Sequence, residues 1–369
     1  MTPRERFLAA VRREEPDRVP VAPLIHCRYA HTVLGRTDWR AVFEVHQKAG
    51  SIAFRGPQGV GCRVEWPDGW RHESRVVQDG SGGTVTESRI ITPHGTLTQK
   101  HIAGMIPHDP ITGKTVEYYI KDHDDYRVYI KYLEKSLETM APAPEGFAEV
   151  METMGEEGIA SVGQGSALDH LGGMRGMEPL LMDVYDRPQT LEAVFSLLAE
   201  AKRRDVQSFL QSAGEVLWYD ICWASCSTMS PETFRKYVLP DVAALADAVR
   251  SAAGKYCGVY TLGKMRALLP MLVDTSVDFI ETFEMNQGDI SLAEAKRTYG
   301  DRVCIMGNYD CVVLARGTLQ EAREEARRCL REGMEGGGYV MVTADEVPGD
   351  TKWDNLRAMV EVAEEEGEY

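Results

Sequence analysis

Side chains that transfer protons or bind substrates recur in this sequence directly after short apolar runs. Glu281 follows Phe279-Ile280, and Asp220 follows Trp218-Tyr219. The carboxyl ends of the parallel strands of a barrel face one pocket, so polar residues at these ends can meet although they are distant in the chain. The residues at the ends of such runs are His26, Arg55, Asp220, Cys257, Glu281, Asn308 and Asp345. We predict that they converge on one site, with helix or turn capping as the alternative for each.

The apolar runs that would position these residues alternate with helical patterns. Strands are predicted at 215–220, 303–308 and 339–343, with helical segments between them. This alternation predicts an α/β fold, a (β/α)8 TIM barrel that spans residues 1–369 as a single domain. Cys257 precedes Gly258, a residue that permits a tight turn, so we expect Cys257 at the carboxyl end of a strand.

Residues 62–121 interrupt the alternation. Val, Ile and Leu are scattered there among Thr, Gly and Pro, and Asp79–Gly83 and Pro93–Gly95 are turn sequences. Such a pattern predicts antiparallel β-hairpins, inserted after the second strand of the barrel. The insertion could serve as a structural flap or as a lid over a substrate.

Composition excludes several classes of function. The chain has 369 residues, a hydrophobic content of 43% and a formal net charge of -16. Strong acidity argues against a nucleic-acid partner and against binding to anionic membranes. No apolar run approaches the ~20 residues of a membrane span. Eight cysteines are too few for a disulfide scaffold, so we expect a reducing, cytoplasmic location.

Several segments resemble the uroporphyrinogen decarboxylase family, which includes the decarboxylase and cobalamin-linked methyltransferases. Residues 2–6 and 16–21 are similar to the family's first helix and strand, and the match is denser from Ser230 to Asn355. The resemblance covers nearly the whole chain. It implies a (β/α)8 barrel with its site at the carboxyl ends of the strands.

The chain departs from the decarboxylase members of this family at the first two strands. Their Arg-Gln-Ala-Gly-Arg motif, whose arginines bind substrate carboxylates, corresponds here to residues 25–29, with Arg28 displaced in register. Their aspartate after the second strand falls near Arg55 or Gly56. Arginine reverses both the charge and the hydrogen-bonding role of an aspartate. Porphyrinogen decarboxylation is therefore disfavoured.

The zinc-dependent methyltransferases of the family carry His-x-Cys-Gly, which we match to Lys255-Tyr256-Cys257-Gly258. Their later zinc cysteine corresponds to Asp345. Only Cys257 of three ligands remains, and a lysine would oppose a cation. We therefore expect no zinc at these positions, with a different metal site built from Cys257, Asp345, Glu281, Asp220 or His26 as the alternative. We expect instead an ion pair of Lys255 with Asp345 or Glu346.

A third group of relatives transfers methyl groups from methoxylated compounds to a corrinoid protein. The resemblance implies an acid that protonates the leaving oxygen while Co(I) attacks the methyl carbon. The candidates for the acid are Asp220, Glu281, Tyr260 and His26. The candidates for substrate binding are Arg28, Arg55, Trp218, Trp223, Cys257, Asn308 and Asp345, with barrel packing as the alternative for the aromatic residues.

We therefore predict O-demethylation by a methyltransferase with no tightly bound cofactor. Its partners would be a corrinoid protein, a small-molecule substrate and, as in many barrels of this family, a second copy of the chain. One alternative is a decarboxylase of a carboxylated cyclic substrate, which would require arginines in one cleft; the candidates are Arg28, Arg55, Arg63 and Arg175. The second alternative is a non-catalytic barrel whose mouth is closed by side chains.

Overall fold

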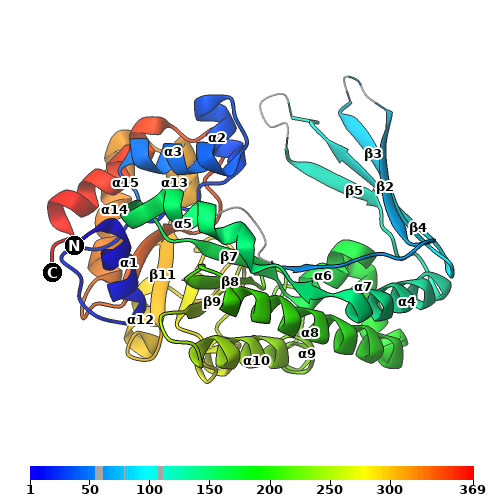
Figure 1. Ribbon diagram of the computed structural model, residues 1–369. Helices are drawn as coiled ribbons and strands as arrows, with labels where there is room; N and C mark the ends of the chain where they lie inside the picture. Colours follow the sequence, from blue (N-terminus) through cyan, green and yellow to red (C-terminus); the bar gives the residue numbers. More distant parts are fainter. Residues whose placement is uncertain (55–60, 79, 81, 107–110) are drawn as a thin grey trace. The chain divides into compact units, whose positions relative to one another are not determined.

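The computed structural model describes residues 1–54, 61–78, 80, 82–106 and 111–369 (Figure 1). The predicted site residue Arg55 lies outside this part of the chain. The chain divides into two compact units, each described here by itself. Unit 1 comprises residues 1–60, 145–166 and 209–369, and unit 2 comprises residues 61–144 and 167–208.

Unit 1 is built on a six-stranded parallel sheet in the order β12-β11-β10-β9-β8-β7. Its strands are β7 (Ser161–Gly165), β8 (Val216–Asp220), β9 (Tyr256–Tyr260), β10 (Phe279–Thr282), β11 (Cys304–Tyr309) and β12 (Tyr339–Thr343). Its helices are α1 (Pro3–Val11), α2 (Cys27–Leu34), α3 (Trp39–Ala49), α5 (Ala148–Met154), α9 (Pro231–Tyr237), α10 (Leu239–Arg250), α11 (Leu269–Val273), α12 (Leu292–Tyr299), α13 (Cys311–Arg316), α14 (Leu319–Gly333) and α15 (Trp353–Glu366). Two short 3₁₀ turns, Pro144–Phe147 and Gly155–Glu157, flank α5.

Two extended segments close the sheet into a ring. Val21 forms a parallel bridge with Met341 of β12, and its carbonyl oxygen accepts a hydrogen bond of 2.8 Å from the Ile52 N–H. The Ala53 carbonyl oxygen then accepts a bond of 2.7 Å from the Ile159 N–H, just before β7. Six strands and two bridging segments thus form the eight-membered ring of a (β/α)8 barrel. The predicted fold class is confirmed.

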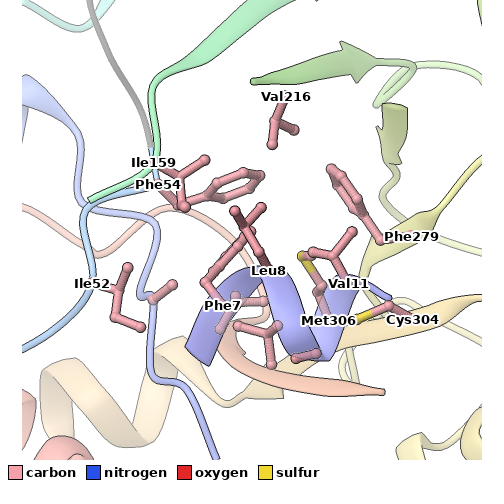
Figure 2. Packing of buried hydrophobic residues seen from close by; sticks show 14 residues of the cluster. Phe7, Leu8, Val11, Ile52, Phe54, Ile159, Val216, Phe279, Cys304 and Met306 are labelled. Atoms are coloured by element: carbon pink, nitrogen blue, oxygen red, sulfur yellow. The ribbon is translucent and has the colours of Figure 1, made fainter. Parts of the chain in front are cut away.

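Helix α1 packs against the amino ends of the strands. Thr2 and Glu5 form a capping box and Pro3 occupies the first turn, so the sequence specifies where this helix begins. The rings of Phe7 and Phe54 lie 4.6 Å apart, and Phe54 meets Phe279 edge-on at 5.7 Å (Figure 2). The same buried cluster contains the first residues of β8, β10 and β11, which places it at the amino end of the barrel.

Gly258 has a different role from the one that the sequence suggested. It is the third residue of β9 and not the start of a turn. A Cβ atom at this position would lie 2.2 Å from the Phe279 ring on the neighbouring strand. Glycine is needed here because an aromatic ring occupies the space of a side chain.

Unit 2 contains the predicted antiparallel sheet, in the order β2-β3-β4-β5. Its strands are β2 (Arg71–Gln78), β3 (Thr84–Thr92), β4 (Gly95–Ala103) and β5 (Gly113–Glu117), with β1 (Cys62–Arg63) and β6 (Ala141–Pro142) paired separately. Its helices are α4 (His123–Thr139), α6 (Ala167–Arg175), α7 (Met177–Asp186) and α8 (Pro188–Gln211), the last of which ends in unit 1. None of the described helices has the length and apolar composition needed to cross a bilayer.

We predict that Gly258→Ala lowers the free energy of unfolding by about 1–3 kcal/mol, because the added methyl group must displace the Phe279 ring. The matched control is Gly173→Ala in α6, where the new Cβ meets no atom within 4 Å. It should be neutral or stabilise by up to about 1 kcal/mol. Urea unfolding measures both variants. Equal stability of Gly258→Ala and wild type would contradict the packing described.

Candidate active site

One row of the barrel sheet brings three predicted residues together at the carboxyl ends of the strands. Asp220 of β8 lies opposite Tyr260 of β9, and Tyr260 lies opposite Glu281 of β10. Phe279, two residues before Glu281, belongs to the interior core. Side chains alternate along a strand, so Glu281 and its neighbours in the row also face the barrel interior.

Trp218 connects this row across the barrel. Its indole N–H donates a hydrogen bond of 2.5 Å to Oε2 of Glu281. Trp218 is on β8 and Glu281 is on β10, so the bond passes the intervening strand β9. The Trp218 ring also lies 4.8 Å from the ring of Tyr260. Glu281 is only 1% exposed, so its carboxyl group is enclosed by protein and lies beside these aromatic rings.

Asp345, in the loop after β12, completes the arrangement. Its Oδ1 accepts a hydrogen bond of 2.7 Å from the Tyr260 hydroxyl and another of 2.7 Å from the Glu346 N–H. Tyr260 therefore directs its proton towards Asp345. The carboxyl group of Glu281, which accepts a hydrogen bond from a neutral indole, and that of Asp220 are the other proton-transfer groups in this row.

The backbone directly after Glu281 is strained. Thr282 has a φ of 132° and Phe283 a φ of 53°, values that are unfavourable for residues other than glycine. The Glu281 carbonyl oxygen accepts bonds of 3.1 and 3.0 Å from the N–H and hydroxyl of Thr261. The Thr282 hydroxyl donates to the Thr261 carbonyl oxygen. These bonds offset part of the strain and fix the direction of the Glu281 side chain.

Asn308 supports the same turn and does not face an open pocket. It is 1% exposed, and its Nδ2 donates a bond of 2.8 Å to the Phe283 carbonyl oxygen. Its Oδ1 accepts a bond of 2.9 Å from Arg328. Both ends of the amide are used within the protein, so we replace its predicted substrate-binding role by a positioning role. Arg328 was not identified from the sequence, because nothing in its helix α14 indicates a partner on a strand.

The predicted position of Cys257 is wrong. Cys257 is the second residue of β9, 1% exposed, and its N–H donates a bond of 2.8 Å to Asp278. Burial raises the pKa of its thiol. The apolar run continues through Val259 and Tyr260, so the strand ends three residues later than predicted, and Cys257 lies near the amino end of the barrel.

The expected ion pair of Lys255 with Asp345 or Glu346 is wrong for the same reason. Lys255 Nζ donates to the carbonyl oxygens of Ser212 and Gly214, at 3.0 and 2.6 Å. It also lies 4.6 Å from the centre of the Phe209 ring, and burial lowers its pKa.

The residues at the true end of β9 do not suit a thiolate–imidazole zinc site. Residues 260–263 read Tyr-Thr-Leu-Gly, which has the glycine spacing of His-x-Cys-Gly without its histidine or cysteine. Asp345, at the position matched to the later cysteine, accepts a hydrogen bond from the Tyr260 hydroxyl. Phenol and aliphatic side chains do not replace the soft ligands that bind and activate a thiol with zinc.

The remaining predicted residues lie around this row. His26 precedes α2, with its Nδ1 3.1 Å from the Cys27 thiol sulfur. Arg28 forms an ion pair of 3.5 Å with Glu346. Trp223, in the loop after β8, is 52% exposed, so it is placed at the rim and not in a buried wall.

The fold and the inward-facing row define a (β/α)8 barrel with a candidate site at the carboxyl ends of its strands. The family model "Uroporphyrinogen decarboxylase (URO-D)" matches residues 115–366, more than half of the chain. The chain belongs to the uroporphyrinogen decarboxylase family.

The relatives of this chain include proteins named as decarboxylases and proteins named as methyltransferases. A uroporphyrinogen decarboxylase of Chlorobaculum parvum is 23% identical over 98% of this chain and 97% of its own length. The methylcobamide:CoM methyltransferase MtaA of Methanosarcina barkeri is 24% identical over 53% of this chain and 58% of its own. A methyltransferase structure from Methanosarcina mazei aligns with a TM-score of 0.65 at 16% identity, covering 99% of each chain, which supports the fold.

We predict that Cys257 stays unmodified when native protein is treated with iodoacetamide, because burial raises its pKa and excludes the reagent. Half-buried Cys27 is the internal control and should be alkylated before Cys257. Mass spectrometry of the digested protein gives the extent of modification at each cysteine. In urea all eight cysteines should react. Rapid native alkylation of Cys257 would place it at an accessible surface and contradict the strand register.

Proposed function

We propose that this chain is a methyltransferase that moves a methyl group from a small methoxylated donor to a corrinoid carried by a partner protein. The observation that supports the proposal is the interior row at the barrel mouth. There a buried carboxyl group, Glu281, lies beside the aromatic rings of Trp218 and Tyr260. Aromatic rings beside a carboxyl group that can donate a proton suit a neutral methoxylated ring.

In this reaction the methyl–oxygen bond of the donor breaks and a methyl–cobalt bond forms. Both electrons of the new bond come from Co(I) of the corrinoid, and the electron pair of the broken bond stays on the oxygen. The oxygen then requires a proton, for which we assign Glu281 as the acid. The Tyr260 hydroxyl donates a hydrogen bond to Asp345, and these two side chains orient the bound donor. The corrinoid is a substrate brought by the partner, and no step uses a resident metal.

The charges at the mouth favour this function over decarboxylation of a porphyrinogen. Besides the acid Glu281, which is protonated in this role, the row and its neighbour contribute two carboxyl groups, from Asp220 and Asp345. Such a site repels a substrate that carries many carboxylates. Among the arginines that a decarboxylase would need, Arg28 is paired with Glu346 and Arg175 is paired with Asp183.

Exposed apolar side chains supply a surface for the corrinoid protein. Trp223 follows β8, Met285 follows β10 and Val312 follows β11, with exposed fractions of 52%, 43% and 57%. All three therefore lie at the same end of the barrel as the acidic row. Contiguous exposed apolar patches are typical of protein-binding surfaces, so we assign the docking of the corrinoid protein to this end of the barrel.

The test is an anaerobic assay with guaiacol as the methyl donor and chemically reduced cob(I)alamin in place of the carrier. The proposal expects loss of the Co(I) absorption together with formation of methylcobalamin and catechol in equal amounts. Assays of ethers with other rings follow if guaiacol is poor. Absence of transfer from every methoxylated donor, with release of CO2 from a porphyrinogen, would overturn the proposal.

We predict that Glu281→Gln lowers kcat about 10²–10⁴-fold with little change in KM, the contribution expected of a positioned acid. Glu365→Gln on the exposed end of α15 is the matched control and should retain wild-type rates. Tyr260→Phe keeps the ring and removes only the hydroxyl bonded to Asp345, so its effect should be smaller than that of Glu281→Gln. Wild-type kcat in Glu281→Gln would remove Glu281 from the acid role.

A further inference from the structure

The antiparallel sheet of unit 2 carries a row of alternating charges across its strands. The strand register places Glu117 beside Lys100, Lys100 beside Glu87, and Glu87 beside Arg75. Two of these neighbours form ion pairs of 3.0 Å, Lys100–Glu117 and Arg75–Glu87. The signs therefore read minus, plus, minus, plus from β5 to β2, and the row ends at Arg75 on the edge of the sheet.

Strand β2 is an exposed edge. Within the described residues it pairs on one side only, with β3, and all eight of its residues are exposed. It includes two apolar side chains, Val76 and Val77, which are 60% and 43% exposed. An exposed edge strand offers unpaired N–H and C=O groups to another strand, and exposed apolar residues on it add a reason to associate. The opposite edge, β5, has five residues and an irregular register.

We propose that β2 pairs antiparallel with β2 of a second copy of this chain, about a two-fold axis at Ser74. Each Arg75 would then lie opposite Glu73 of the second copy. Glu73 is already the register neighbour of Arg89 on β3. The row of alternating signs would thus continue through Glu73 and Arg89 of the second copy, so the two sheets form one sheet without a break in the charge pattern.

The charges select this register over its neighbours. An axis at Glu73 would place two glutamates opposite each other and Arg71 opposite Arg75. An axis at Arg75 would place two arginines opposite each other. Like charges directly opposite in a sheet are destabilising, and opposite charges are stabilising. On the other face of the sheet, the Ser74 axis places Val76 opposite His72 of the second copy and covers part of the exposed valine. The inference does not depend on the reaction that the barrel catalyses.

The first test is sedimentation over a concentration series. Wild-type protein should be a reversible dimer. Ser74→Lys places two cations on the axis and should raise the dimer dissociation constant at least about tenfold. The matched control is Val116→Lys, a lysine at an exposed position of β5, and should leave the dissociation constant unchanged. Thermal unfolding of both variants verifies that they fold. A wild-type monomer at all concentrations, or a dimer that Ser74→Lys leaves intact, would overturn the proposal.

The second test is a disulfide cross-link across the axis. Opposed residues in an antiparallel pair have Cα atoms ~4.5–5.5 Å apart, within the range that a disulfide spans. Ser74→Cys should therefore form a covalent dimer on mild oxidation, whereas Lys114→Cys on β5 and the wild type, with its native cysteines, should not. Equal cross-linking of Lys114→Cys, or none in Ser74→Cys, would show that β2 is not the interface.

Discussion

The packing of the Phe279 ring over Gly258 fixes how β8, β9 and β10 align. This alignment determines which residues lie side by side at the carboxyl ends of these strands. Trp218, Gly258 and Phe279 lie in one row across β8, β9 and β10. Two large aromatic side chains fit in this row because the residue between them has no side chain. The next inward-facing row, two residues further along each strand, then brings Asp220, Tyr260 and Glu281 to the mouth, where the Trp218 indole N–H donates a hydrogen bond to Glu281.

A second constraint acts on the turn that follows Glu281. Two residues with positive φ follow this acid, and they are held by hydrogen bonds with Thr261 after β9 and Asn308 on β11. Asn308 is held in turn by a hydrogen bond from Arg328 on α14. Strain of this kind persists only where the surroundings determine it. These hydrogen bonds are therefore part of the site, because they fix the direction in which the buried Glu281 carboxyl group points.

The sequence was sufficient for the fold and for the acids at the strand ends, because both follow from periodicity and from the geometry of parallel barrels. Asp220 and Glu281 lie near the carboxyl ends of β8 and β10, where the sequence placed them, whereas Tyr260 was named only as a candidate acid because its strand was predicted to end at Cys257. The end of β9 was not predictable from its residues. Apolar residues continue on both sides of Gly258, and a glycine reads as a turn unless the ring of Phe279 is known to lie over it. Hydrogen bonds between different strands, such as the one from Trp218 to Glu281, cannot be predicted from the spacing of residues in the sequence.

If the acidic, aromatic-walled mouth takes a neutral methoxylated ring, as we propose, it should reject a polycarboxylate. Calorimetric titration of the wild-type protein with an octacarboxylate porphyrin measures this preference, with guaiacol titrated under the same conditions. We expect saturable binding of guaiacol and no saturable binding of the porphyrin. Binding of the porphyrin at one molecule per chain, with no binding of guaiacol, would contradict it.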